Sequence, residues 1–208
     1  SFYKIDKKKL VLNYRGVSKK DFPYNFKAPE RWLKIWQKDF PQTKNKIILT
    51  LPARITRWKG QDDFIILLKK ITEKNPNVHG LIVGEEKNKA RFINKLKSQA
   101  SKLELNKNLT FVGHRSDIRE IMSISKIVFS LSKEPEAFGR ISLESLSMGI
   151  PVIAYSHGGV KEQMLEILPE GLIAVENINL VASLANKWIK KGPESNKTHS
   201  FMLKNMLE

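Results

Sequence analysis

From residue 46 onward, short continuous apolar runs alternate with longer amphipathic stretches. The apolar runs predict six strands, at residues 47–51, 81–84, 109–113, 127–129, 151–154 and 171–175. The stretches between them predict helices over 61–73, 88–103, 117–125 and 139–149, and a last helix that reaches residue 190. Ser116 is expected to cap the helix at 117–125, and Asn177 or Asn179 the last one. Strands that are apolar throughout are buried on both faces, so the pattern predicts a doubly wound, Rossmann-like α/β domain with a parallel sheet and helices on both faces.

The first 45 residues follow a different pattern and are predicted to be a linker with a leading helix. A short strand is predicted at residues 10–12, and Pro29 stands near the start of a helix predicted over 29–40. Trp32, Trp36 and Phe40 fall on one face of that helix, which we expect to pack on the domain. The lysines between them leave contact with a membrane as the alternative. The chain is thus divided into a linker and helix at 1–45, a Rossmann-like domain at 46–191 and a tail at 192–208.

The charge balance is strongly basic. The 208 residues include 37 Lys and Arg against 21 Asp and Glu, a formal net charge of +16. Residues 1–45 hold 12 basic and 4 acidic residues, which is half of the excess in a fifth of the chain. This excess is compatible with nucleic acid, an anionic membrane surface or phosphorylated substrates, and equally with a solvated, lysine-rich surface.

Several protein classes lack support in the sequence. No apolar run approaches the roughly 18 residues of a membrane-spanning helix. Cysteine is absent, so the redox compartment stays open and a cytoplasmic location is the default expectation. The four histidines show no metal-ligand spacing, so no metal site is expected. Neither G-x-G-x-x-G nor G-x4-G-K-[ST] follows the first strand, which disfavours a dehydrogenase and a P-loop nucleotidase.

Polar residues and glycines follow five of the predicted strands, where each strand ends. Because parallel strands end at one edge of a sheet, these residues should line one crevice, where open α/β sheets bind ligands. Arg and Lys supply phosphate-binding donors, glycines let the backbone approach a ligand, and carboxylates accept hydrogen bonds from sugar hydroxyls. Glu136 and Glu144 are expected in a loop and in the following helix, where they would reach different parts of one extended ligand. The crevice therefore predicts a nucleotide-sugar site, and its residues are Arg54, Arg57, Lys59, Gly60, Glu85, Gly113, His114, Arg115, Glu134, Glu136, Phe138, Gly139, Ser156, His157, Gly158 and Gly159.

Five motifs occur in a fixed order along the chain. They are Arg-x4-Lys-Gly at 54–60, Phe-x-Gly at 111–113, Glu-x-Phe-Gly-x4-Glu at 136–144, Gly-x-Pro-Val at 149–152 and Gly-Gly at 158–159. In this order they resemble the donor-binding C-terminal domain of the family 4 retaining glycosyltransferases, which have the two-domain GT-B fold. The resemblance covers about residues 10–190, and it is closest to bacterial members that build lipopolysaccharide or other surface glycans.

The resemblance implies a hexosyltransferase that uses a UDP-, GDP- or ADP-sugar and needs no metal or other cofactor. It implies that Arg54 and Lys59 hold the diphosphate, that Glu136 contacts the transferred sugar, and that Glu144 binds the ribose diol. It places backbone amides beside the sugar and the residues after Gly113 near the base. The catalytic residues are then Arg54, Lys59 and Glu136, and the donor-binding residues are Gly60, Gly113, His114, Arg115, Phe138, Gly139, Arg140, Glu144, Gly158 and Gly159.

The resemblance also implies a larger enzyme. Residues 15–22 (RGVSKKDF) resemble the segment that leaves the N-terminal domain in this family, and the chain stops before the helix that normally returns to that domain. We therefore expect a fragment with little or no transfer activity of its own, whose glycan or lipid-linked acceptor binds to the missing N-terminal domain. The basic residues 1–45 favour peripheral contact with an anionic membrane at its cytoplasmic face.

Two other kinds of protein stay open on the sequence alone. A sugar-nucleotide epimerase or a glycan phosphorylase is possible within the same fold. A basic nucleic-acid-binding module would explain the net charge, but it would leave the ordered crevice motifs without a role. Nucleic acid is therefore not the expected partner.

Overall fold

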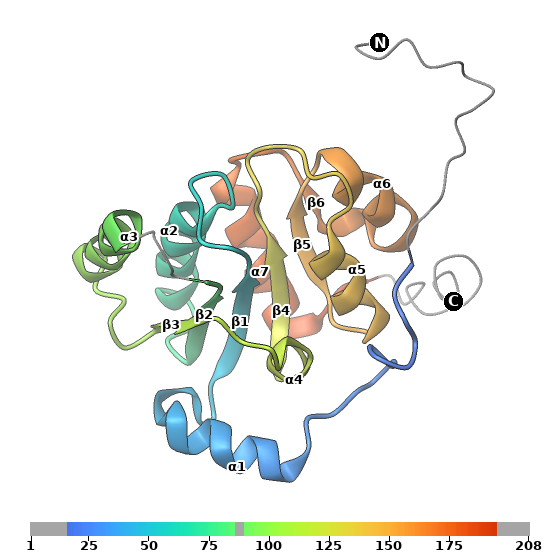
Figure 1. The fold of residues 1–208 in the computed structure, drawn as a ribbon. Helices are drawn as coiled ribbons and strands as arrows, with labels where there is room; N and C mark the ends of the chain where they lie inside the picture. The colour runs from blue at the N-terminus through green and yellow to red at the C-terminus, as the bar shows by residue number, and fades with distance from the viewer. Residues whose placement is uncertain (1–15, 86–89, 195–208) are drawn as a thin grey trace, which may run out of the picture.

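The computed structural model describes residues 16–85 and 90–194, which form a six-stranded parallel sheet between two layers of helices (Figure 1). The strand order is β3-β2-β1-β4-β5-β6, and all five neighbouring pairs are parallel. Every residue of β2 and β5 is buried, as the continuous apolar runs require. The predicted fold class is thereby confirmed. The strands are β1 (Ile47–Pro52), β2 (Val78–Val83), β3 (Leu109–Gly113), β4 (Ser125–Ser130), β5 (Val152–Tyr155) and β6 (Leu172–Ile173).

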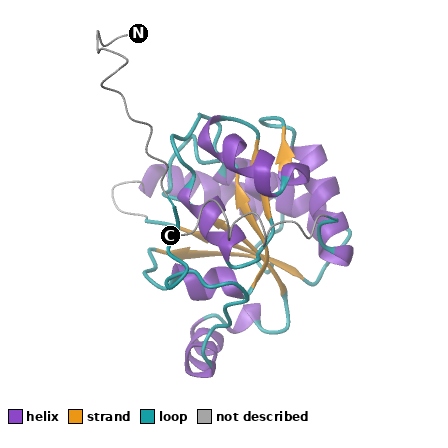
Figure 2. Ribbon diagram, turned by 90° about the vertical axis from the view of Figure 1, so that its right-hand side faces the viewer, coloured by secondary structure: helices purple, strands orange, loops and turns teal. Residues whose placement is uncertain are grey.

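The helices cover both faces of this sheet. α2 packs against both α3 and α7 on one face, and α5 packs against α6 on the other. In Figure 1, α7 lies behind the strands and α5 in front of them, and Figure 2 shows helices on both sides of the strands. The helices are α1 (Glu30–Asp39), α2 (Gln61–Thr72), α3 (Ala90–Lys102), α4 (Ile118–Ser123), α5 (Arg140–Ser147), α6 (Gly158–Ile167) and α7 (Ile178–Lys191), with 3-10 turns at Pro41–Thr43 and Pro169–Gly171.

Two predicted elements differ from the structure. The sixth strand was expected over 171–175, but only Leu172–Ile173 pairs with the sheet, because a 3-10 turn precedes it and Glu176 has a left-handed φ of 63°. The helix expected over 117–125 is shorter and Ser116 does not cap it; Asp117 holds the N-cap position and offers no side-chain cap bond. Asn177 does cap α7, since its side chain accepts a hydrogen bond from the amide of Leu180 at 3.1 Å.

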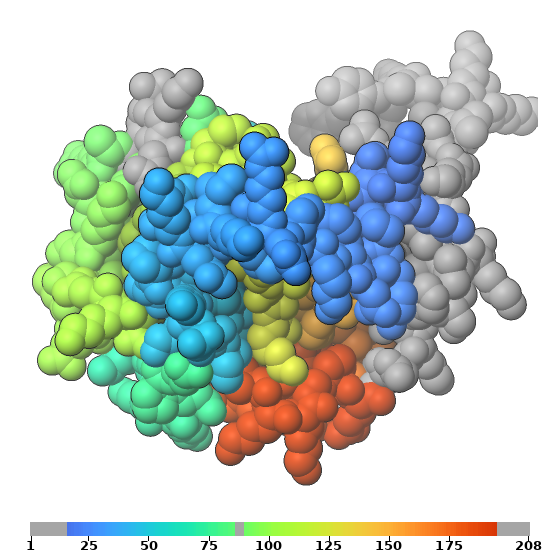
Figure 3. Space-filling view, turned by 90° about the horizontal axis from the view of Figure 1, so that it is seen from below, coloured from blue at the N-terminus to red at the C-terminus, as the bar shows by residue number. Residues whose placement is uncertain are grey.

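Helix α1 packs on the domain through its aromatic face, as predicted. Trp36 is 3% exposed and lies against Ile48 and Leu81 of the sheet. The ring of Trp32 stacks on that of Trp36, with 5.1 Å between centroids, and Phe40 follows at 4.4 Å. Figure 3 shows α1 and the segment before it as a blue band across the underside of the molecule. We call Trp32, Trp36 and Phe40 the aromatic cluster.

Some predictions concern residues outside the described ranges. The strand expected at 10–12, the first residues of the helix expected over 88–103, and most of the tail at 192–208 belong to this group. Within residues 16–85 and 90–194, no helix is long and apolar enough to cross a bilayer.

The strand order reverses direction between β1 and β4, which are neighbours in the sheet although β2 and β3 separate them in sequence. Chain segments therefore leave this point toward opposite halves of the sheet, and a crevice opens at the carboxyl ends of β1 and β4. Such a reversal is where open α/β sheets bind ligands.

Candidate functional site

An ion pair lies at this reversal. Lys59, in the loop after β1, places its Nζ 2.6 Å from Oε1 of Glu136, in the loop after β4. The two side chains are 12% and 20% exposed, so the pair is shielded from water but reachable. The Lys59 ammonium also lies 4.3 Å from the ring centroid of Trp58, a cation–π contact that limits where it can move. The sequence pattern predicts both residues in one crevice, and in the structure they are in direct contact.

Gly60 explains why Lys59 reaches this position. It begins α2 with φ 73°, a left-handed conformation that glycine adopts without strain. A Cβ at this residue would collide with the backbone carbonyl of Leu131 at the end of β4. The absence of a side chain thus lets the loop after β1 approach the loop after β4.

The loop that carries Glu136 is held from the other side by the start of α6. The Gly159 amide donates to the Glu136 carbonyl at 2.8 Å. Gly158 has φ 57°, and a Cβ there would lie 2.5 Å from the same carbonyl oxygen. The His157 ring donates through Nε2 to the carbonyl of Ser132 at 2.6 Å, and the Ser132 hydroxyl in turn donates to Oε1 of Glu136. The predicted glycines at 158 and 159 therefore support the position of Glu136.

A partly buried charge network around Lys133 also fixes this loop. The Lys133 ammonium lies 2.9 Å from Asp62, 2.8 Å from Asp63 and 3.5 Å from Glu176. The Tyr155 hydroxyl donates to Asp63 at 2.7 Å. Burial alone would lower the pKa of Lys133, but the hydrogen bonds that its ammonium donates to Asp63 and Asp62 raise the pKa above its usual value. Burial and the contact with Asp63 likewise raise the pKa of Tyr155.

Lys133 is a site-supporting residue that sequence analysis missed. Its partners Asp62 and Asp63 lie about 70 residues away, and no local spacing links them. The backbone amide of Lys133 also donates to the Trp58 carbonyl at 2.6 Å, which ties the two loops of the site together. The edge cluster, as we call this group, consists of Lys59, Asp62, Asp63, Ser132, Lys133 and Glu136.

A cavity of about 300 Å³ opens beside the ion pair. Its walls come from the ends of β1 and β4 and from the start of α5. Gly139 begins α5 with φ 73°, and the Gln163 side chain donates to the carbonyl of Phe138 and so holds the turn before it. The residues that line the cavity are Leu51, Pro52, Ala53, Lys59, Phe129, Ser130, Leu131, Ser132, Glu136, Phe138, Gly139, Arg140 and Ile141.

Glu144 lies one helical turn into α5 and is buried. Its side chain is 5% exposed, whereas its partner Arg140 is 73% exposed and reaches back to it, with 2.8 Å between Nη2 and Oε1. Burial raises the pKa of Glu144, although the hydrogen bond and charge of Arg140 oppose this shift. As expected, Glu136 lies in a loop and Glu144 in the following helix, where Arg140 lies beside Glu144.

The remaining predicted residues lie further from the ion pair. Arg54 is exposed, and its backbone carbonyl accepts a hydrogen bond from Gln61 at 2.9 Å. Gly113 ends β3, and His114 after it is exposed. Arg115 is engaged locally by Asp117, with contacts of 2.8 and 2.6 Å, and this pair raises the pKa of Arg115. The structure thus gathers Lys59, Glu136 and Gly139 around one cavity, and it leaves Arg54 and His114 at the surface around it.

In residues 16–85 and 90–194, no group of three or more His, Asp or Glu side chains is arranged to hold a metal ion. Two carboxylates of the edge cluster, Asp62 and Asp63, instead contact the Lys133 ammonium.

The parallel sheet, the reversal of its strand order between β1 and β4, and the crevice at its carboxyl edge define a Rossmann-like α/β domain. This type of domain is found in GT-B glycosyltransferases. A glycosyltransferase from Rickettsia africae superposes with a TM-score of 0.82 and 27% identity, over 98% of this chain and 55% of that one. The family described as "Glycosyl transferases group 1" matches residues 33–201, and the chain belongs to this family.

Other relatives agree with this assignment. An uncharacterized glycosyltransferase of Methanocaldococcus jannaschii is 31% identical over 53% of this chain and 26% of its own length. A trehalose synthase of Pyrococcus horikoshii is 27% identical over 61% of this chain and 32% of its own length. The C-terminal domain of LpcC from Francisella tularensis, a glycosyl transferase group 1 protein, shares the fold with a TM-score of 0.74 at 20% identity, over 91% of this chain and 98% of that one. The chain spans about a third or less of these curated relatives and about half of the Rickettsia structure.

Proposed function

We propose that this domain binds the nucleotide-sugar donor of a retaining glycosyltransferase of family 4 that transfers a hexosyl group to a glycan or a lipid-linked acceptor. The observation that carries the proposal is the shielded pair of Lys59 and Glu136 at the reversal of strand order. It supplies a cation for phosphate and a carboxylate for sugar hydroxyls within one small cavity. Solved structures of HepE from Anabaena, which shares the fold with a TM-score of 0.74 at 24% identity, over 93% of this chain and 50% of that one, hold UDP and glucose, and in another case UDP-glucose. These structures support a UDP-sugar as the first donor to test.

The ion pair suggests how the site exchanges partners when a donor binds. A diphosphate that enters the cavity competes with Glu136 for the Lys59 ammonium. The Glu136 carboxylate, still held by Ser132, is then free to accept hydrogen bonds from the sugar hydroxyls. Arg54 forms no hydrogen bond or ion pair through its side chain within the described residues, so it is available to swing toward the same diphosphate.

We propose that these two cations take the place of a metal ion. As the glycosidic bond breaks, negative charge grows on the departing diphosphate, and Lys59 and Arg54 would stabilise it more strongly than they stabilise the bound donor. Glu144, behind Arg140, is assigned to the ribose diol. This requires the exposed Arg140 side chain to move aside, which its 73% exposure allows.

The acceptor is assigned to the half of the GT-B relatives that this chain does not span. For a lipid-linked acceptor, the basic residues 1–45 would favour a cytoplasmic enzyme that contacts an anionic membrane surface. Sedimentation with vesicles should then show more protein bound to anionic than to neutral lipid. Equal binding to both would contradict the membrane contact.

Calorimetry with a panel of UDP-, GDP- and ADP-glucose tests the donor site. We expect Lys59→Met to weaken binding of UDP-glucose and of free UDP at least tenfold, because a charge-assisted hydrogen bond contributes about 1.5–3 kcal/mol. Glu136→Gln should weaken UDP-glucose binding, since this carboxylate is assigned to the sugar, and it should not weaken UDP binding, because the carboxylate then no longer competes for Lys59. The control Lys126→Met removes an exposed lysine of β4 and should change neither.

The difference between these two variants decides the assignment. If Glu136→Gln weakens UDP and UDP-glucose equally, the sugar role of Glu136 is wrong. If the unmodified chain binds none of the three nucleotide-sugars at millimolar concentration, the donor-site proposal itself is wrong.

A further inference from the structure

A second, larger pocket lies on the other side of the loop that carries Lys59. It has a volume of about 1220 Å³ and lies between that loop, the start of α2 and the first turns of α3. Lys59 faces the donor cavity, whereas the three residues before it, Thr56, Arg57 and Trp58, line this second pocket. The nucleotide-sugar proposal uses none of its three cations, Arg57, Arg91 and Lys95. We call it the cationic pocket, and it is lined by Thr56, Arg57, Trp58, Asp62, Arg91, Phe92 and Lys95.

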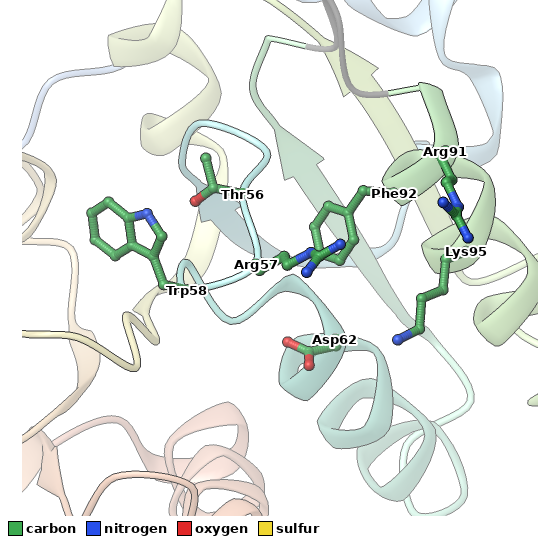
Figure 4. A pocket seen from close by; sticks show the side chains of 7 residues that line it. All are labelled: Thr56, Arg57, Trp58, Asp62, Arg91, Phe92 and Lys95. Atoms are coloured by element: carbon green, nitrogen blue, oxygen red, sulfur yellow. The ribbon is translucent and has the colours of Figure 1, made fainter.

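Three cations from two segments converge on this pocket. Figure 4 shows Arg57 reaching from the loop toward α3, and Lys95 reaching from α3 toward Asp62. Arg91 and Lys95 are four residues apart on α3, so both lie on the same face of the helix. Like charges at this spacing destabilise a helix, and the approach of Arg57 adds to the repulsion.

Asp62 is the one carboxylate among the described lining residues, and a single carboxylate does not balance three cations. Asp62 already pairs with Lys133, with 2.9 Å between Oδ2 and Nζ. Within the described residues, Arg57, Arg91 and Lys95 form no ion pair, whereas Lys59, Lys69, Arg115, Arg119, Lys133, Arg140 and Lys187 each have one. Among the described residues, the pocket lining therefore carries an excess of positive charge that a bound anion would neutralise.

The rest of the lining indicates what kind of anion fits. Arg57 and Arg91 offer planar forks of donors that match phosphate oxygens, and Lys95 adds a flexible point charge. Phe92 supplies half-buried aromatic surface beside Arg57, whereas the Trp58 side chain points away from α3 (Figure 4) and its ring lies 4.3 Å from the Lys59 ammonium. The hydroxyl of Thr56 is buried and has no hydrogen-bond partner in the described structure. The combination suits a phosphate joined to a group with an apolar face, such as a sugar ring or a lipid glycerol.

We propose that the cationic pocket is a second phosphate-binding site, separate from the donor diphosphate site and divided from it by the loop that carries Lys59. Its ligand is a phosphate-bearing group, which either belongs to a soluble phosphorylated saccharide or forms the headgroup of an anionic lipid. The proposal does not depend on the identity of the sugar donor.

The test removes the pocket charges and compares the result with an equal loss of charge elsewhere. The pocket variant combines Arg57→Gln, Arg91→Gln and Lys95→Gln. The control variant combines Arg31→Gln, Lys70→Gln and Lys126→Gln, which are exposed residues on α1, α2 and β4. Each protein is titrated with glucose 1-phosphate and with inorganic pyrophosphate in a calorimeter, and it is sedimented with phosphatidylglycerol and with phosphatidylcholine vesicles.

We expect the unmodified chain and the control variant to bind at least one of these phosphate ligands, and the pocket variant to bind it at least tenfold more weakly. Loss of glucose 1-phosphate binding assigns a soluble saccharide phosphate, and loss of phosphatidylglycerol binding alone assigns a lipid headgroup. If the pocket and control variants lose affinity equally, or if the unmodified chain binds none of the ligands, the proposal is wrong.

Pyrophosphate also separates this proposal from the donor site. The unmodified chain should bind two equivalents, of which Lys59→Met removes one and the pocket variant removes the other. If Lys59→Met does not change pyrophosphate binding but the pocket variant does, the proposal for the cationic pocket is supported and the donor-site assignment is wrong.

Discussion

The aromatic cluster and the edge cluster keep their side chains in place by different means. Trp32, Trp36 and Phe40 lie within one helix and its end, and contacts between neighbouring rings hold them together. The indole N–H groups of the two tryptophans also donate hydrogen bonds, to Asp117 and Thr43. The edge cluster joins segments that lie about 70 residues apart in sequence, and charge pairs hold it together. Packed apolar side chains offer a polar ligand no group to bind, whereas a charged side chain can exchange its ion-pair partner for a charged ligand. The comparison therefore assigns stability to the first region and binding to the second.

The largest effect should come from Trp36→Ala in the aromatic cluster. Loss of a buried tryptophan leaves a cavity over Ile48 and Leu81, and it should lower the free energy of unfolding by about 4 kcal/mol. Denaturant unfolding measures this change, and the exposed neighbour Ile35→Ala, as control, should cost about 0.5 kcal/mol or less. Calorimetry on the folded variant should show unchanged UDP-glucose binding. Weaker UDP-glucose binding by the folded variant would contradict the assignment of stability to the aromatic cluster and of binding to the edge cluster.

Lys133→Met should have the next largest effect, and it should affect both stability and binding. The Asp63 side chain, 7% exposed, would lose its cation, and removing one partner of a buried pair costs about 3 kcal/mol. Donor binding should weaken too, because the loop that carries Glu136 loses an anchor. Adding Asp63→Asn should recover part of the stability, since the uncompensated carboxylate is then gone.

A matched control for Lys133→Met is Lys187→Met. Lys187 also pairs with a carboxylate, Glu194 at 2.6 Å, but both side chains are exposed. This change should leave the unfolding midpoint where it is. Equal effects of the two lysine changes would contradict the structural role of the buried network.

His79 should make the α1 side of the sheet sensitive to acid. It is fully buried in β2 and shares a hydrogen bond of 2.8 Å with Thr110, and burial lowers its pKa from 6.5 to about 4. Its stabilising contribution is therefore complete above about pH 6.5 and is lost as pH falls toward 4. Relative to His79→Gln, the native chain should lose about 2 kcal/mol between pH 7 and pH 5, since one unit of pKa shift corresponds to about 1.4 kcal/mol. Parallel stability curves for the two proteins would contradict this.

Glu144 should show the smallest effect, with the opposite sign. Burial raises its pKa, so its contribution to stability is complete below the unfolded pKa and is lost as pH rises through the folded one. The stability of the native chain relative to Glu144→Gln should therefore be greater at pH 4 than at pH 7. Thermal unfolding at the two pH values measures this difference, and an unchanged difference would mean that Arg140 fully offsets the burial.

The sequence predicted those parts of the domain that depend on local pattern. The continuous apolar runs predicted six parallel strands, although the edge strand β3 is only half-buried along most of its length, and the spacing of Trp32, Trp36 and Phe40 predicted the packed face of α1. The sixth strand was predicted too long, because the left-handed turn at Glu176 leaves no signal in hydrophobicity.

In the site, the rule that parallel strands end at one edge was enough to place Lys59 and Glu136 in one crevice. It could not predict Lys133, since the carboxylates that hold it lie on a helix distant in sequence and their pairing arises only through tertiary packing. It also could not show that Arg115 is engaged by Asp117, or that Arg57 faces away from the crevice into a second pocket.

The loop after β4 is tied down at three places before any ligand arrives: by the carbonyl of Trp58, by the ring of His157 and by the amide of Gly159. A segment anchored in this way does not need to close over its ligand, so the donor should meet a ready surface. In a stopped-flow experiment the association trace should contain a single phase whose rate rises linearly with donor concentration, without the plateau that a slow rearrangement imposes. Under the proposed assignment, the rate of donor capture is then limited by encounter with the ligand and not by reshaping of the loop.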